Sequence, residues 1–221
     1  SGRVDLALSP YAHPVLPLLL DIRAGAETQP EARLPLIDRY AGGRERARWH
    51  LRHGRDVFER HFGITPAGCW PSEGALSNAT LELLATEGFR WSASGENVLR
   101  NSIGAGAGHA DLHAPGHTCQ HRVYRFAENT LDCFFHDDGL SDLIGFTYSE
   151  WHAEDAVANL VHHLENIKAA CANCRDCAVV IILDGENAWE HYPETGHYCL
   201  DALYRALSRH PGSVLGTFRG V

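Results

Sequence analysis

The sequence predicts an α/β fold in which parallel strands alternate with helices. Short runs rich in β-forming residues are separated by longer segments with helical periodicity, and a parallel connection needs a crossover long enough for a helix. Residues 178–183, Ala-Val-Val-Ile-Ile-Leu, contain no polar side chain, which is typical of a strand buried on both faces. We therefore expect a parallel sheet or barrel with this run at its centre.

The period of the apolar residues places each element in chain order. Strands are expected at residues 3–8, 67–70, 89–93, 131–135, 178–183 and 214–218. Helices are expected at residues 44–62, 78–88, 153–170 and 198–209. The Gly-rich stretch that starts at Ser102 and continues in polar residues to Gln120 is predicted to be a long surface loop or lid. Because no repeat or composition shift divides the chain, residues 1–221 are expected to form a single domain.

Composition excludes several classes of protein. The chain has 19 Lys and Arg against 28 Asp and Glu, a formal charge of −9, which argues against a nucleic-acid partner. Residues 15–20, the longest apolar run near the start, are interrupted by Pro17 and fall short of the roughly 20 residues that span a bilayer. The seven Cys are an odd number at irregular spacing, which indicates free thiols. We expect a cytoplasmic protein without a membrane or nucleic-acid partner.

Two carboxylates follow predicted strands and are candidate catalytic groups. Glu73 comes after the run 67–70, and Asp184 comes directly after the run 178–183. Chemistry gathers at the carboxyl ends of parallel strands. Hydrolysis of a glycosidic bond with retention needs an ionised and a protonated carboxyl about 5 to 5.5 Å apart. The alternative is that these strand-end acids only cap the helices that follow them.

Aromatic residues near these turns offer flat apolar faces on which sugar rings stack. They are Trp70, Trp91, Tyr148, Trp151, Trp189 and Tyr192.

Four blocks of the sequence resemble glycoside hydrolase family 57. They are GRVDLALSPYAHPVLPLLLD at residues 2–21, CWPSEGALS at 69–77, FHDDGLSDLIGFTYSEW at 135–151 and IILDGENAWEHYPETG at 181–196. The blocks occur in the family's order. The resemblance implies an incomplete (β/α)7 barrel that acts on α-glucans such as starch, glycogen and maltooligosaccharides. It implies an amylase, amylopullulanase, branching enzyme or glucanotransferase that needs no cofactor.

The same resemblance assigns roles to individual residues. Glu73 matches the catalytic nucleophile, Asp184 the general acid/base, and His13 a motif histidine near the substrate. The substrate-binding set is completed by residues of the matching blocks and by Trp91, one of the aromatic residues near the predicted turns: Trp70, Trp91, Asp142, Glu186 and Trp189.

The chain also departs from the family pattern. The family's first block, His-Gln-Pro, and its final block are absent, so we expect an excerpt that lacks at least the first barrel strand. Such an excerpt would be stabilised by the remaining segments or as a homo-oligomer. His136 stands where the family more often has Arg.

Two possible metal sites lack a complete ligand set. Cys171, Cys174 and Cys177 supply three thiols without a fourth ligand at a signature distance. Histidines recur every fourth residue, but Pro115 breaks any helix there: His109, His113, His117 and His121. We expect no bound metal.

Two other functions stay open. One is a metal-dependent carbohydrate deacetylase on a distorted barrel, with His13 and strand-end acids as ligands. The other is a non-catalytic glucan-binding fragment. Within the glycosidase interpretation, hydrolysis and transfer are not separated by these blocks.

Overall fold

The computed structural model describes residues 4–28, 31, 33–37, 39–107, 120–126, 131–172, 177–185, 189–212 and 214–220. The strands are β1 (Gly68–Cys69), β2 (Trp91–Gly95), β3 (Tyr124–Arg125) and β4 (Asp132–His136). The α-helices are α1 (Leu16–Leu20), α2 (Gly25–Thr28), α3 (Gly43–Phe62), α4 (Asn78–Thr86), α5 (Glu96–Ala107), α6 (Asp138–Asp142), α7 (Ala153–Ala170) and α8 (His197–Arg209). Short 3-10 turns lie at Ile22–Ala24, Ser72–Gly74, Tyr148–Glu150 and Pro193–Gly196, and a π-helical turn at Leu143–Thr147.

The strands form one sheet in the order β1-β2-β4-β3. β2 is parallel to both β1 and β4, and the register aligns Gly95 with His136 at the carboxyl ends. β3 is antiparallel to β4. The mixed α/β class is confirmed.

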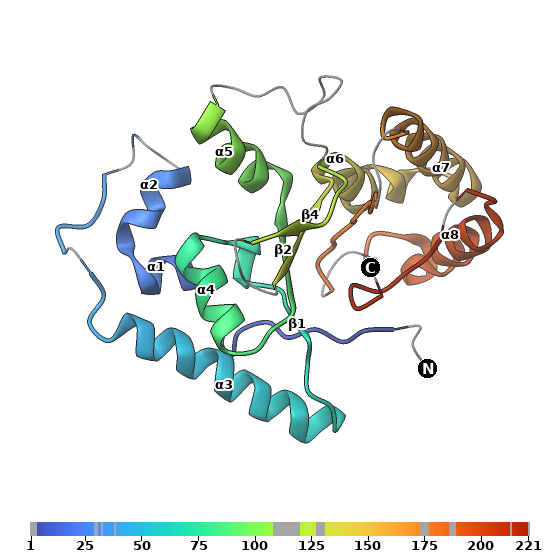
Figure 1. The fold of residues 1–221 in the computed structure, drawn as a ribbon. Coiled ribbons are helices and arrows are strands. Elements are labelled where there is room, and N and C mark those ends of the chain that lie inside the picture. Colours follow the sequence, from blue (N-terminus) through green and yellow to red (C-terminus); the bar gives the residue numbers. More distant parts are fainter. Residues whose placement is uncertain are drawn as a thin grey trace.

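Side chains on β4 alternate between two packed layers, as the strand period requires. Cys133 and Phe135 join the apolar cluster under α1, α3 and α4. Phe134 faces the opposite layer, where it packs with Trp91 and Val180. The sheet lies between these layers (Figure 1).

The C-terminal helices pack in a cluster of their own. α7 and α8 lie side by side and bury Leu160 and Ala202 against Tyr148 (Figure 1). Tyr192 lies in the same cluster and donates its hydroxyl to the carbonyl of Ile144 at 2.5 Å. This cluster borders the segment that carries Asp184, because Ile181 and Leu183 pack against it.

The four predicted helices are present with nearly the predicted bounds. α3 ends at Gly63, whose φ of 66° gives the left-handed cap that suits glycine. α4 begins after Ser77, whose hydroxyl accepts from the amide of Thr80 at 3.3 Å.

Three predicted strands are not strands in the structure. Residues 3–8 contribute a single bridge from Leu8 to Cys69, and residues 214–218 are irregular where described. Residues 178–183 are irregular as well, with the amide of Asp137 donating to the carbonyl of Val180 at 2.9 Å. β3 pairs with Asp132 and Cys133 at the start of β4, and residues 178–183 form no ladder beside the rest of the strand.

The predicted loop from Ser102 to Gln120 is wrong in its first part. Residues up to Ala107 belong to α5, because Leu99 and Ile103 are spaced by one helical turn and pack on the core. Residues 108–119 lie outside the described part.

No helix in the described part of the chain is long and apolar enough to cross a membrane.

Candidate active site

Glu73 projects from a strained turn at the carboxyl end of β1. The turn Ser72–Gly74 gives Glu73 a φ of 58°, a left-handed conformation that is uncommon for a non-glycine residue. The buried hydroxyl of Ser94 donates to the carbonyl of Gly74 at 2.5 Å and ties this turn to β2. The Glu73 side chain is 74% exposed. The turn therefore presents a carboxylate to solvent from a fixed backbone.

His13 contacts Glu73 from a second strained turn. Ala12 and His13 have φ values of 58° and 56°, and the His13 amide donates to the carbonyl of Pro10 at 3.0 Å. His13 Nε2 lies 3.1 Å from Glu73 Oε1. Backbone strain of this kind costs about 1–3 kcal/mol per residue and clusters at functional sites. Two strained turns here meet in one polar contact.

Trp70 lies between the Glu73 turn and the end of β4. A Cβ added at Gly74 would lie 3.0 Å from the Trp70 ring. The Trp70 ring also meets the His136 ring edge to face, with centroids 6.3 Å apart. The half-buried indole is therefore fixed beside Glu73 and keeps part of its surface exposed.

Asp184 is exposed at the end of the irregular segment 177–185. This segment is tied to α6, because the amide of Ile182 donates to Ser141 Oγ at 3.3 Å. Val180 is attached next to β4 through the amide of Asp137. These two contacts place the segment that precedes Asp184 beside the residues that directly follow β4.

Acidic residues gather after β2 and β4. Glu96 Oε2 accepts from Gln120 Nε2 at 3.1 Å and from the Asp138 amide at 3.3 Å. Asp137 Oδ1 caps α6 through the amide of Leu140 at 2.8 Å. Burial raises the pKa of Asp138, and the nearby Glu96 adds to that rise while His136 opposes it. The main structural role of these acidic residues is to connect the start of α5 with the start of α6.

The remaining predicted substrate-binding residues differ in their surroundings. Asp142 is the exposed last residue of α6. Trp189 is half-buried and packs on Tyr192 with ring centroids 5.1 Å apart. Glu186 lies outside the described residues.

Trp91 requires a correction, because it is a core residue. It is 4% exposed and is the first residue of β2, at the opposite end of the strand from the predicted site. Its ring lies across Gly68, where an added Cβ would be 1.9 Å away, and stacks near Phe218 with centroids 4.3 Å apart. An indole in this position has no face to offer a sugar.

The possible metal sites gain no support from the described residues. No group of three His, Cys, Asp or Glu in the described ranges is placed to hold a metal ion. His121 is described and pairs with Asp137 at 3.6 Å. Cys174, His109, His113 and His117 lie outside the described residues.

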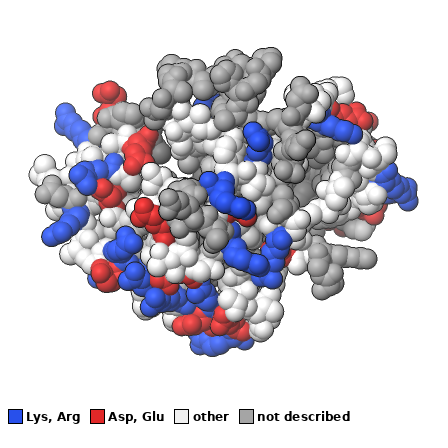
Figure 2. All heavy atoms as spheres, viewed as in Figure 1, with Lys and Arg blue, Asp and Glu red and all other residues white. Residues whose placement is uncertain are grey.

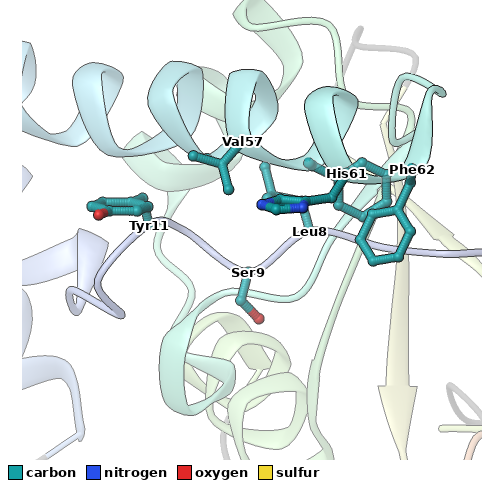
Figure 3. A pocket seen from close by; sticks show the side chains of 8 residues that line it. Leu8, Ser9, Tyr11, Val57, His61 and Phe62 are labelled. Carbon is teal, nitrogen blue, oxygen red and sulfur yellow. The ribbon is translucent and has the colours of Figure 1, made fainter.

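An apolar groove lies apart from these residues. It has a volume of about 530 Å³ and runs between α3 and the N-terminal segment (Figure 3). Leu8, Tyr11 and Phe62 line it, whereas Glu73 and Asp184 do not. On the face seen in Figure 2, the Lys and Arg of the described residues are interspersed with Asp and Glu.

Sequence reasoning did not select Glu96, His136 or Ser141 as site residues. Glu96 and His136 stand at or directly after the ends of paired strands, which is the signal that found Glu73. Ser141 carries no such signal, since its bond from the Ile182 amide joins positions 41 residues apart.

The sequence matches the profile of one protein family. The sequence profile of glycosyl hydrolase family 57 matches residues 1–218. No curated protein matches the sequence.

Solved structures share the fold at low sequence identity. The 4-alpha-glucanotransferase from Thermococcus litoralis aligns with a TM-score of 0.59 and 15% identity over 99% of this chain and 28% of that one. The GH57-type branching enzyme from Pyrococcus horikoshii aligns with a TM-score of 0.62 and 15% identity over 98% and 46%. The alpha-amylase AmyC from Thermotoga maritima aligns with a TM-score of 0.62 and 13% identity over 99% and 48%. The chain thus spans less than half the length of these structures.

Proposed function

Because the chain belongs to glycosyl hydrolase family 57, we propose that it cleaves or transfers α-glucosidic bonds by a retaining double displacement. The substrates are α-glucans such as starch, glycogen and maltooligosaccharides. The sheet would be part of the family's incomplete (β/α)7 barrel, completed by further segments or by a second copy of the chain.

The pairing of His13 with Glu73 is the observation that carries this proposal. The 3.1 Å contact joins two turns that each hold a non-glycine residue in the left-handed region. A residue that served only as a helix cap would need neither the exposure of Glu73 nor an imidazole partner from 60 positions away. A fixed, exposed carboxylate suits a nucleophile that must reach an anomeric carbon.

The chemistry follows from the two carboxyls. The Glu73 carboxylate attacks the anomeric carbon while Asp184 gives its proton to the leaving glycosidic oxygen. The bond between the anomeric carbon and that oxygen breaks. Asp184 then takes a proton from water or from a sugar hydroxyl, whose oxygen attacks the same carbon and releases Glu73. Water gives hydrolysis, and a sugar gives transfer. Trp70 would offer its ring beside the nucleophile.

Two variants test the assignment. Glu73→Gln should abolish activity on starch, maltooligosaccharides and an aryl α-maltooligosaccharide alike, because no nucleophile remains. Asp184→Asn should lose at least about 100-fold in kcat on starch, since general acid help is worth 10²–10⁴. On the aryl substrate, Asp184→Asn should still form the glycosyl-enzyme at Glu73, because an aryl leaving group needs little protonation. Full activity of either variant on starch would exclude its assigned role.

Metal analysis distinguishes the proposed glycosidase from the metal-dependent deacetylase. Purified protein should contain less than one Zn, Fe or Ni per chain, and a chelator should leave glucan cleavage unchanged. One tightly bound metal per chain, together with release of acetate from an acetylated sugar, would favour the deacetylase instead. Glucan binding without turnover would favour the non-catalytic alternative.

A further inference from the structure

We propose that His136 is a positioning residue for the reaction proposed above, which this inference presupposes. Its imidazole joins the segment before Glu73 to the segment before Asp184. The ring contacts Trp70, which precedes the Glu73 turn, and Nδ1 contacts Ser141, which holds the backbone at Ile182. The two proposed catalytic carboxyls come from segments 111 positions apart, and the His136 side chain touches the supports of both.

The first contact is between rings. His136 ends β4 and lies beside Gly95, where an added Cβ would be 3.4 Å from Nε2. The Trp70 and His136 rings are inclined at 64° with centroids 6.3 Å apart, an edge-to-face arrangement. Trp70 is half-buried, so this contact restricts the indole on the side of β4 and leaves its other surface available to a sugar.

The second contact is polar and has a defined direction. Ser141 Oγ donates its single proton to the carbonyl of Asp137 at 2.8 Å. The same oxygen therefore accepts from the Ile182 amide at 3.3 Å and from His136 Nδ1 at 3.2 Å. His136 must then carry a proton on Nδ1, which also faces Asp138 Oδ1 at 3.4 Å. The imidazole thus fixes the hydroxyl that holds Ile182, two residues before Asp184.

Two substitutions separate these contacts. His136→Phe keeps a ring against Trp70 but removes Nδ1, whereas His136→Asn keeps a polar donor near Nδ1 and removes most of the ring. On maltoheptaose, His136→Phe should lower kcat by about tenfold or more with KM within about twofold, because the Asp184 segment is displaced. His136→Asn should keep kcat within about threefold and raise KM about fivefold or more, because Trp70 loses its support. His162→Asn, an exposed histidine on α7, is the matched control and should change neither constant.

Amide hydrogen exchange gives a readout that does not depend on turnover. The Ile182 amide should exchange about tenfold faster in His136→Phe than in the wild type, and at the wild-type rate in His136→Asn and His162→Asn. Equal losses of kcat in both His136 variants, or an unchanged Ile182 amide in His136→Phe, would overturn the inference. If the wild type cleaves no glucan, the proposed function fails, while the exchange experiment still decides whether His136 holds the Asp184 segment.

Discussion

At the scale of single residues, the site is built from strained backbone. Glu73 and His13 occupy the left-handed region, where a side chain costs about 1–2 kcal/mol relative to glycine. Nothing in the packing of Glu73 repays that cost, since its side chain is 74% exposed. A conformation retained without a packing reason is expected where the side chain is needed for chemistry.

Replacing Glu73 with glycine should therefore stabilise the protein and abolish its activity. We expect Glu73→Gly to raise the free energy of unfolding by up to about 1 kcal/mol, measured by urea denaturation, because glycine adopts φ 58° without a Cβ clash. The control is Glu82→Gly in the middle of α4, which should destabilise by about 1 kcal/mol. Destabilisation by Glu73→Gly as large as that of the control would show that the turn is not strained.

Among these residues, the sequence indicated Glu73 and Asp184 because each follows a recognisable strand or apolar run, and Trp70 because it is the aromatic residue that ends the run 67–70. It misassigned Trp91, which lies inside the run 89–93 and is buried as the first residue of β2. The role of His136 could not be read from spacing, because its partners, Trp70 and Ser141, come from different elements.

At the scale of elements, α3 is fixed to the end of α4 by a buried carboxylate. Glu87 accepts from Arg52 Nε at 2.8 Å and from Arg48 Nε at 2.9 Å, with its side chain only 4% exposed. Burial by itself raises the pKa of Glu87, but the hydrogen bonds from Arg52 and Arg48 outweigh it and lower the pKa. Arg55 adds a bond to the Glu87 carbonyl at 2.5 Å.

This arrangement gives a prediction with a defined pH range. A lowered folded-state pKa means that Glu87 stabilises the protein above its unfolded pKa, about 4.3, and loses this contribution as the pH falls through the folded value. Glu87→Gln should cost about 1–3 kcal/mol at neutral pH, from the loss of charge-assisted bonds. The difference between wild type and variant, measured by denaturation, should shrink between about pH 5 and pH 2. A difference that is constant over this range would contradict the assignment.

The elements themselves differed in how far the sequence determined them. α3, α4, α7 and α8 were predicted closely, since each has a helical apolar period and a local start or stop signal. Residues 178–183 were expected to be a central strand because they are wholly apolar. In the structure Val180 is buried and Ile181, Ile182 and Leu183 are half-buried against two apolar clusters, so packing accounts for their composition without a ladder.

At the scale of the molecule, the apolar layers on both faces of the sheet should protect its thiols. Burial raises the pKa of Cys133 to about 12 and raises that of Cys69 as well. In the native protein at about pH 8, neither thiol should react with Ellman's reagent, whereas both should react in guanidinium chloride. Peptide mapping after alkylation identifies the modified residues. Rapid labelling of Cys69 in the native state would show that the layer under α3 and α4 opens readily.

Trapping the covalent intermediate tests whether Glu73 is the nucleophile of a retaining reaction on α-glucans. Asp184→Asn protein should be incubated with a 5-fluoro α-maltosyl fluoride, digested with pepsin and analysed by tandem mass spectrometry. We predict one added glycosyl group on the peptide that contains Glu73, absent when Glu73→Gln is combined with the same variant. A glycosyl group on another carboxylate, or inverted product with no adduct, would rule out Glu73 as the nucleophile.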